Sequence, residues 1–256
     1  MTVLLGTSGW HYKDWRGRFY PPDVPQRAWL EFYARHFATV ESNNAFYRLP
    51  EGERFAAWAR ATPDDFVMAV KMSRYLTHIK RLRDPEEPVA RFLDRAQHLG
   101  DKLGPVLLQL PPTLRADLEL LDATLSRFPE HVRVAVEFRH ESWWTQETRS
   151  LLEQHRSALC LADRNSRPIA PLWRTTNWTY LRLHAGAASP SPCYGRGALA
   201  TWTQRLDDEF HDALAFVYFN NDPKGCALRD ARWFAQEAMK RGLEITRSPS
   251  QPIRPG

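Results

Sequence analysis

The segment from Val134 to Trp144, VAVEFRHESWW, places residues capable of acid–base chemistry at the end of a predicted strand. Its apolar and polar residues alternate with a period of two, which indicates a buried strand with Glu137 and Arg139 on one face. Burying a carboxylate and a guanidinium costs desolvation free energy that packing alone does not offset. We therefore predict that Glu137 is a general acid or base, and that Arg139 and His140 tune it or hold an oxyanion.

Apolar segments with strand patterning recur along the chain, and segments with the 3.6-residue apolar spacing of helices lie between most of them. The predicted strands are Val3–Thr7, Ala38–Asn43, Phe66–Lys71, Val106–Leu110, Arg133–Phe138, Ala158–Asp163, Thr179–His184 and Ala215–Asn220. The predicted helices are Ala28–Phe37, Phe55–Ala61, Val89–Leu103, Leu114–Phe128, Glu147–His155, Leu199–His211 and Asp230–Arg241. We expect helix N-caps at Thr113 and Thr145, and helix ends at Gly104 and Gly242.

Eight alternations of strand and helix within 256 residues predict an α/β fold made of a single (β/α)8 TIM barrel. A doubly wound open sheet is the structural alternative. Several predicted strands have one wholly apolar face, which suits packing on helices, and one face of small or polar residues, which suits the inside of a barrel. We expect the barrel to span residues 1–242 without an internal boundary, and residues 243–256 to be an extension of low order.

Chemistry in such barrels lies at the C-terminal ends of the strands, and nearly every predicted strand ends in a polar or charged residue. The expected substrate-binding residues at these ends are Glu41, Asn43, Lys71, Gln109, Arg182, His184, Asn220 and Asp222. Asp163 is a further catalytic candidate, with a helix N-cap as its alternative role. The charges are near balance, so each carboxylate can be kept ionised by a cationic neighbour. Buried ion pairs that only join strands are the alternative for Glu41, Lys71 and Arg182.

Aromatic and cationic side chains share the loops after several predicted strands. Trp10 and Tyr12 follow the first strand, and with Trp143 they are candidate stacking walls for a substrate. A hydrophobic plug that closes one end of the barrel is the alternative role of the aromatic residues after the first strand. Arg74 and His78 follow the third strand, where Arg74 would bind negative charge.

Composition is that of an ordinary globular protein, with 43% hydrophobic and 25% charged residues. A net charge of +5 weakly favours an anionic partner, although solubility explains it as well. No apolar run is long enough to span a bilayer, and the N-terminus lacks the pattern of a signal peptide, so no membrane partner is expected. The cysteines Cys160, Cys193 and Cys226 are odd in number and far apart, which predicts no disulfide framework and a cytoplasmic setting.

Cofactor and metal motifs are missing from the sequence. The GTSGW segment is not a GxGxxG motif, and there is no Walker A motif, so no nucleotide cofactor is indicated. No HxH or HExxH spacing occurs, so we predict no tightly bound metal; the patterns leave open a weakly held divalent metal ion.

The chain resembles the YecE-like family of bacterial TIM-barrel proteins, a family of unknown function. The matching segments span nearly the whole chain in the family's order and are GTSGWHYKDW, TVESNNAFYRLP, FVMAVKMSRYLTHIKRL, LGPVLLQLPP, VAVEFRHESWW, YLRLHA and VYFNND. The resemblance implies a single TIM barrel and no established activity. Two positions depart from the family pattern: Ala45 replaces a frequent Thr, and Ala185 replaces the Gly that usually follows the R-x-H segment.

These patterns predict an enzyme that acts on a small polar molecule, anionic or sugar-like, in a cleft at the C-terminal face of the barrel. The fold suggests a hydrolase or an isomerase, but it hosts many chemistries. One alternative is a nucleic-acid or phosphodiester-binding protein, which the basic pI of about 9.2 supports. Another is a non-catalytic adaptor that binds a metabolite. The sequence leaves the oligomeric state open.

Overall fold

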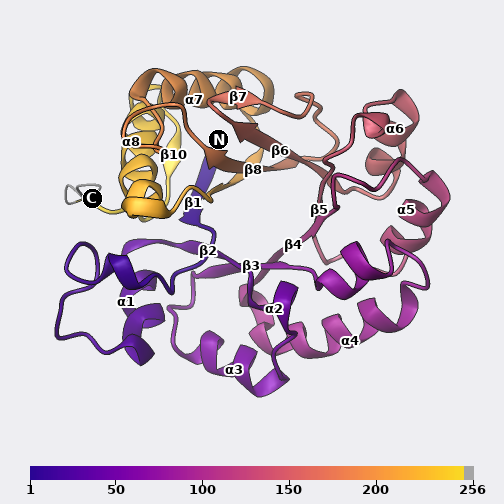
Figure 1. Cartoon of the computed structure of the whole chain (residues 1–256), viewed down its shortest axis with the longest axis horizontal. Helices are drawn as coiled ribbons and strands as arrows, with labels where there is room; N and C mark the ends of the chain where they lie inside the picture. Colours follow the sequence, from indigo (N-terminus) through magenta and orange to yellow (C-terminus); the bar gives the residue numbers. More distant parts are fainter. Residues whose placement is uncertain (251–256) are drawn as a thin grey trace.

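A curled sheet forms the centre of the protein, whose computed structural model describes residues 1–250 (Figure 1). All eight predicted strands are present, as β1 (Thr2–Thr7), β2 (Thr39–Ser42), β3 (Val67–Lys71), β4 (Leu103–Gln109), β5 (Val134–Glu137), β6 (Ala158–Arg164), β8 (Trp178–Ala185) and β9 (Leu214–Phe219). They pair in parallel. Two short strands were not predicted: β7 (Arg167–Pro168) pairs antiparallel with β6, and β10 (Glu244–Ile245) pairs parallel with β1.

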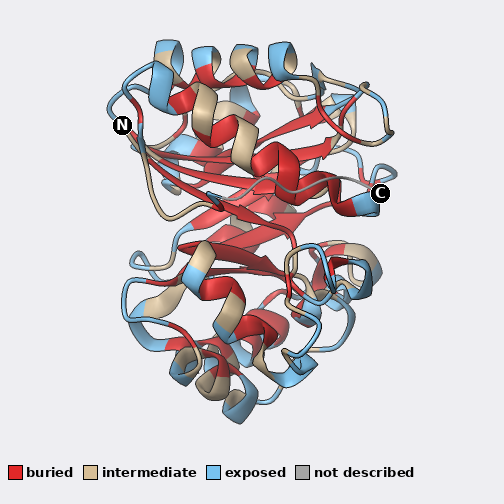
Figure 2. Cartoon of the chain, turned by 90° about the vertical axis from the view of Figure 1, so that its left-hand side faces the viewer, coloured by how far each residue is buried: buried red, intermediate tan, exposed pale blue. Residues whose placement is uncertain are grey.

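Helices surround the sheet and turn their exposed faces outward, while the strands between them are buried (Figures 1 and 2). Their bounds are α1 (Trp29–His36), α2 (Asn44–Tyr47), α3 (Gly52–Arg60), α4 (Glu86–Ala96), α5 (Leu118–Leu125), α6 (Gln146–Gln154), α7 (Arg196–Phe210) and α8 (Cys226–Lys240). Short 3-10 turns are η1 (Lys13–Trp15), η2 (Gln26–Ala28), η4 (Gln97–Lys102), η5 (Glu141–Trp143) and η6 (Pro223–Gly225), and η3 (Tyr75–Ile79) is π-helical. Only α2 lacks a predicted counterpart among the α-helices. Within residues 1–250, no helix has the length and apolar character needed to cross a membrane.

The predicted helix boundaries are half right. Thr145 caps α6 with its side chain, and Gly242 follows α8 with a φ of +78°, as expected of a residue just past a helix end. Thr113 does not cap α5, because Asp117 accepts the first-turn amide instead. Gly104 does not end a helix but lies in β4, where β3 approaches so closely that a Cβ atom would clash.

Alternation along the strands sorts side chains between two apolar clusters, as the sequence predicts. One cluster fills the inside of the curled sheet and includes Leu4, Ala69, Leu107, Ala135, Cys160, Tyr180, Phe216 and Tyr218. The other packs between sheet and helices and includes Val70, Val106, Val136, Leu181 and Val217. Every second side chain of a strand points to the same face of the sheet. The inward positions at the C-terminal ends of the strands are therefore Lys71, Gln109, Glu137 and Arg182.

The α/β fold with a curled parallel sheet is confirmed, but a closed eight-stranded barrel is not. Within the described residues, β1 and β2 share only one isolated bridge, between Ser8 and Glu41, and a bond from Gly9 N to Glu41 O of 2.8 Å. We call this open edge the seam. At Gly6 a Cβ atom would lie 2.3 Å from Thr39 O, so the two strands approach without forming a ladder and only glycine fits there.

Side chains bridge the seam where backbone pairing is missing. The Tyr33 hydroxyl of α1 accepts from Thr7 N at 3.0 Å and donates to Thr39 O at 3.1 Å. Thr39 Oγ1 lies 2.7 Å from the Tyr218 hydroxyl of β9. Buried hydrogen bonds of this kind hold the edge strand β2 against the opposite side of the sheet.

The C-terminal segment returns to the sheet and contacts β1. Beyond β10, Thr246 N donates to Val3 O at 3.1 Å, and Arg247 pairs with Asp65 at 2.5 and 3.0 Å. Residues 244–247 thus complete the edge of β1, beyond the predicted barrel boundary at residue 242, and the expectation of low order from residue 243 onward stays a prediction. The same expectation for residues 251–256 lies outside the described residues.

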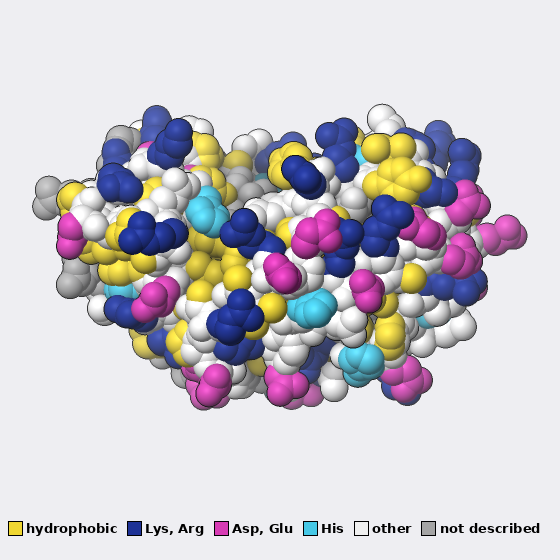
Figure 3. Space-filling view, turned by 90° about the horizontal axis from the view of Figure 1, so that it is seen from below, with side chains coloured by type: hydrophobic (Ala, Val, Ile, Leu, Met, Phe, Trp, Pro, Cys, Tyr) yellow, Lys and Arg dark blue, Asp and Glu magenta, His cyan; other side chains and the backbone are white. Residues whose placement is uncertain are grey.

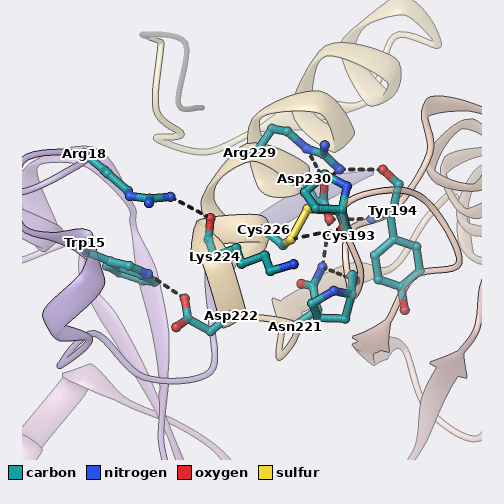
Figure 4. Close-up of a disulfide and its surroundings, with 12 residues drawn as sticks. Trp15, Arg18, Cys193, Tyr194, Asn221, Asp222, Lys224, Cys226, Arg229 and Asp230 are labelled. Atoms are coloured by element: carbon teal, nitrogen blue, oxygen red, sulfur yellow. Dashed lines mark hydrogen bonds and ion pairs between the residues drawn. A yellow bond between two sulfur atoms is a disulfide. The ribbon is translucent and has the colours of Figure 1, made fainter. Parts of the chain in front are cut away.

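The prediction that the cysteines form no disulfide is wrong, because Cys193 and Cys226 are bonded (Figure 4). The bond joins the loop after β8 to the first residue of α8. Buried hydrogen bonds reinforce it, since Asp230 accepts from Tyr194 N and from Asn221, each at 2.7 Å. Only the fold brings these cysteines together, because α7 and β9 separate them in sequence. The argument for a reducing compartment thereby loses its premise.

Candidate functional site

Seven inward-facing or neighbouring side chains meet at the C-terminal ends of the strands, and we call them the strand-end cluster: Glu41, Lys71, Gln109, Glu137, Arg139, Arg182 and His184. Arg182 of β8 lies at its centre and is 1% exposed. Its Nη2 bonds Glu41 Oε1 at 2.8 Å, and its Nη1 bonds Glu137 Oε2 at 2.5 Å. Burial raises the pKa of both carboxyls, but the charge and hydrogen bonds of Arg182 outweigh burial and hold each pKa below its usual value.

The second oxygen of Glu137 is also occupied. Glu137 Oε1 accepts from Arg139 Nε at 2.8 Å and lies 3.2 Å from His184 Nε2. The Nδ1 of His184 lies 3.0 Å from Asn220 Nδ2, and an amide nitrogen can only donate, so the proton of His184 is on Nε2. Burial lowers the pKa of His184 more than Glu137 raises it, which keeps the ring neutral. A fully buried, ionised Glu137 suits orienting its donors better than giving up a proton.

Three cationic side chains converge on one neutral oxygen, Gln109 Oε1. It accepts from Lys71 Nζ at 2.8 Å, from Arg139 Nη2 at 3.1 Å and, at longer range, from Arg182 Nη1 at 3.4 Å. Lys71 is 8% exposed and, unlike the two arginines, forms no ion pair with a carboxylate in residues 1–250. Burial, and next the charge of Arg182, lowers the pKa of Lys71 to about 8. The cluster thus contains one buried amine that is bonded to an amide oxygen instead of a carboxylate.

An aromatic ring connects this amine to His78 of the π-helical turn η3. Lys71 Nζ lies 3.9 Å from the centre of the Phe46 ring, and the Phe46 and His78 rings meet edge to face at 5.0 Å. His78 Nδ1 lies 2.9 Å from Thr77 Oγ1. Burial lowers the pKa of His78 to about 4, assisted by the positive charges of Lys71, Arg74, Arg139 and Arg81. His78 is therefore neutral at pH 7, and it lies in a region of positive potential.

The predicted stacking residues Trp10 and Trp143 do not line the strand-end cluster. Trp10 is 2% exposed and packs edge-on against Trp58 at 5.4 Å. Trp143 is fully buried, stacks on Phe138 at 4.5 Å and donates from Nε1 to Leu114 O at 2.9 Å. Both rings therefore fill core space.

The predicted catalytic residues Asp163 and His140 also lie apart from the cluster. Asp163 points outward and accepts from the Tyr194 hydroxyl and from Trp202 Nε1, each at 2.7 Å. The alternation of β6 shows the reason, because Asp163 shares the outward face of Leu159 and Leu161. His140 Nδ1 accepts from Ser142 N at 3.1 Å, so this histidine caps the turn η5.

Three other predicted residues lie around the seam side of the site. Asp222 Oδ1 accepts from Trp15 Nε1 at 2.5 Å, which connects the loop after β9 to the loop after β1 (Figure 4). Burial, and next the charge of Asp14, raises the pKa of Asp222 to about 7. Tyr12 donates to Ser8 O, and Asn43 immediately precedes α2.

The sequence reading missed several residues of this region. Tyr180, whose hydroxyl bonds Glu41 at 2.7 Å, could have been found because it precedes Arg182 by two positions on the same face. Phe46 gave no such signal. Also missed is a groove of about 920 Å³ beside the seam, lined by Trp10, His11, Arg48, Arg54, Trp58 and other residues of α1 to α3. Of the predicted site residues, only Trp10 lines it.

Metal ligation has little support from the geometry. In the described part of the chain, no three His, Cys, Asp or Glu side chains are grouped to hold a metal ion. Glu137 and His184 are hydrogen-bonded to each other, and Arg182 occupies the second carboxylate oxygen of Glu137. A cation at Glu137 would therefore have to displace a guanidinium.

Comparisons with known proteins agree on a family. Residues 4–254 match the family model described as "Protein of unknown function DUF72". The UPF0759 protein YecE of Escherichia coli K12 is 36% identical over 118 residues, which are 46% of this chain and only 43% of that protein. The structure of a DUF72 family protein from Thermotoga maritima has a TM-score of 0.81 at 28% identity, covering 92% of this chain and 98% of that one. A DUF72 protein from Enterococcus faecalis, 20% identical, shares the fold with a TM-score of 0.79 over 97% of this chain and 99% of that one. These matches confirm the resemblance inferred from the sequence segments.

The Arg182→Met substitution tests the central ion pairs. It leaves Glu41 and Glu137 buried without their common partner, and losing one member of a buried charge cluster typically costs about 3–5 kcal/mol. We expect the free energy of unfolding, measured by urea denaturation, to fall by that amount. Arg149→Met is the control, because its exposed pair with Glu153 contributes less than about 1 kcal/mol. Equal losses in the two variants would contradict the central role of Arg182.

The Asp222→Asn substitution tests the raised pKa of Asp222. An Asp with a folded-state pKa of about 7, against an ordinary 3.8, makes the wild type lose stability as pH rises from about 4 to about 7. The asparagine cannot ionise but still accepts from Trp15. We expect the variant to gain about 4 kcal/mol relative to the wild type between pH 4 and pH 8 in urea denaturation, because a shift of about three pKa units corresponds to that free energy. A difference in stability that stays constant across this pH range would contradict the raised pKa of Asp222.

Proposed function

We propose that this chain, which belongs to the DUF72 family of proteins of unknown function, is an enzyme that binds a small anionic substrate at the ends of β3, β4 and β5. The observation that carries the proposal is Lys71, a buried ammonium with no carboxylate partner among residues 1–250. Burying an unpaired charge is costly. Such a side chain therefore marks a place where a ligand supplies the opposite charge.

The surroundings of Lys71 favour an anion as well. Burial lowers the pKa of His78, and the positive charges of Lys71, Arg74, Arg139 and Arg81 lower it further. The backbone here is also unusual: His78 lies in a π-helical turn, and Arg81 and Leu82 adopt positive φ angles of 55° and 69°. π-Helical turns and strained non-glycine residues occur mainly at functional sites.

Arg139 is the second anion-binding group in this proposal. It uses Nε for Glu137 and Nη2 for Gln109, which leaves Nη1 as a donor toward a ligand. A planar guanidinium next to an ammonium suits the oxygens of a carboxylate or a phosphate. A phosphorylated or carboxylated sugar-like molecule would satisfy both side chains.

His78 is better placed than Glu137 to move a proton. The Thr77 hydroxyl donates to Ser73 O at 3.3 Å, so it accepts from Nδ1–H of His78 and leaves Nε2 as a free acceptor. By contrast, both carboxylate oxygens of Glu137 are already hydrogen-bonded, to side chains of Arg139, Arg182 and His184. A hydrolase or an isomerase reaction is compatible with proton transfer at His78 Nε2.

The Lys71→Met substitution tests the anion site. We expect wild-type protein to bind inorganic phosphate or oxalate at low ionic strength in calorimetric titration, and the variant to bind at least about tenfold more weakly, because a charge-assisted hydrogen bond is lost. Lys102→Met is the matched control, since Lys102 bonds two backbone carbonyls, of Ala59 and Thr62, at the opposite ends of the strands. Equal binding by the two variants would refute the assignment.

Turnover separates an enzyme from an adaptor. Metabolite mixtures of phosphorylated and carboxylated compounds would be incubated with the wild type and with Lys71→Met, and followed by NMR. A ligand that binds but stays chemically unchanged would replace the enzyme proposal by the non-catalytic adaptor.

Nucleic-acid binding is a second candidate function, because large apolar side chains are exposed beside basic ones. Tyr47, Tyr75 and Ile79 are 74%, 43% and 62% exposed in the loops after β2 and β3. Phe46 connects these loops by contacting both Tyr47 and His78. In Figure 3, basic side chains similarly lie beside hydrophobic ones along the upper edge, with acidic side chains interspersed. Exposed aromatic rings with arginines can stack bases and bind phosphates.

A double substitution, Tyr47→Ala with Tyr75→Ala, tests this second function. We expect a fluorescent single-stranded oligonucleotide to bind the wild type with an affinity that falls as salt rises, and the variant to bind at least about tenfold more weakly. Ile169→Ala removes an exposed apolar side chain elsewhere and serves as the control. If the fluorescence anisotropy of the oligonucleotide does not change when wild-type protein is added at low salt, nucleic-acid binding is ruled out.

A further inference from the structure

We propose that Lys71 is a nucleophile that forms an imine with the carbonyl carbon of a small 2-oxo anion or oxo phosphate. The inference rests on the proposed anion site and names the chemistry within it. Its starting point is the placement of the amine at a strand end, fixed by Gln109 and adjacent to Arg139. Lysines that react with carbonyl groups need a neutral, desolvated amine held next to the groups that bind the substrate.

The contacts of Lys71 favour an amine that gives up its proton easily. A carboxylate partner would hold the proton on Nζ, but its only hydrogen-bond acceptor in the described residues is the amide oxygen of Gln109. That same oxygen also accepts from Arg139 and Arg182, which weakens its hold on the ammonium. The Phe46 ring, 3.9 Å away, keeps water from one side of the amine. The pKa of Lys71, lowered to about 8, agrees with this geometry.

Other lysines in the described chain have different surroundings. Lys102 donates to two backbone carbonyls, Lys80 pairs with Asp84 at 2.9 Å, and Lys240 pairs with Glu237 at 2.8 Å. Lys13 and Lys224 lie at exposed positions. Lys71 alone combines burial with an inward position at the ends of the strands, so selective reaction at this residue is expected.

Arg139 determines which carbonyl compound would fit. Lys71 Nζ and Arg139 Nη2 bond the same oxygen atom, so the two side chains lie within reach of one three-carbon molecule. In a 2-oxo acid the carboxylate is bonded directly to the carbonyl carbon, and in an oxo phosphate the phosphate lies two bonds further on. Either arrangement places the anion on Arg139 while the carbonyl carbon faces Lys71.

The reaction needs no further reactant. The neutral Nζ attacks the carbonyl carbon, a C–N bond forms, and the π electrons move to the oxygen, which takes up a proton. The resulting carbinolamine expels its oxygen as water, which leaves a protonated imine. In total, one ammonium and one carbonyl give one iminium and one water, so charge and atoms balance. The positive charge of the cluster is unchanged, and hydrolysis reverses the step.

Reductive trapping tests the inference. The full-length protein would be incubated with pyruvate or with dihydroxyacetone phosphate and sodium cyanoborohydride, and labelled lysines would be located by peptide mass mapping. We expect Lys71 to be labelled at least about tenfold faster than any other lysine at pH 7.5, because far more of it is neutral. Labelling should rise between pH 6 and 8 and level off above pH 9, whereas labelling of the other lysines continues to rise.

The Lys71→Arg substitution distinguishes the role of Lys71 as a nucleophile from its role as a positive charge. The variant keeps a cation but has no nucleophilic amine, so we expect phosphate binding to persist and labelling at this position to disappear. Excess oxalate should protect Lys71 in the wild type. If oxalate or phosphate binds while Lys71 is labelled no faster than Lys102, the imine is refuted and the anion site stands. If neither anion binds and no lysine is labelled selectively, both proposals fail.

Discussion

The ion pairs of Arg182 with Glu41 and Glu137 are the interaction on which the rest of the structure depends. β2 is the end of the hydrogen-bonded sheet, and it is held to β8 by Arg182 and Tyr180 across the interior rather than by a ladder to β1. Three buried charges are stable there because each is paired and hydrogen-bonded. The residues that fix the curvature of the sheet are thus the same residues that surround the candidate site.

The contacts of the strand-end charges divide them into two groups. Glu41, Glu137 and Arg182 satisfy one another and have little capacity left for a ligand. Lys71 and His78 differ, since one is a buried cation without a carboxylate and the other is a histidine kept neutral by surrounding cations. The residues with capacity left for a ligand therefore lie toward β3 and its following loop, not around Glu137.

Most of the correct sequence-based predictions came from the periodicity of apolar and polar residues along the strands. It located all eight main strands and the inward positions of Lys71, Gln109, Glu137 and Arg182, because a period of two fixes the face of each residue. The same rule, applied to β6, would have excluded Asp163. Closure of the sheet, the disulfide and the burial of Trp10 could not be read in this way. These features depend on how closely segments that are distant in sequence approach each other. The close approach of Gly6 to Thr39 O is an example, and no local sequence pattern encodes such a distance.

The pairing of β1 with β9 and β10 determines when the fold can be completed. The first strand of the chain has no ladder with the second, and its neighbours on both sides come from the last part of the sequence, so that Thr2 pairs with Leu214 and with Glu244. On a ribosome, β1 must wait without its sheet partners until nearly all of the chain has been synthesised. The middle strands β2 to β8 can pair in order as they emerge, whereas β1 is incorporated last, with the C-terminal segment. The apolar residues of β1 therefore stay without their sheet partners until β9 and β10 have been synthesised.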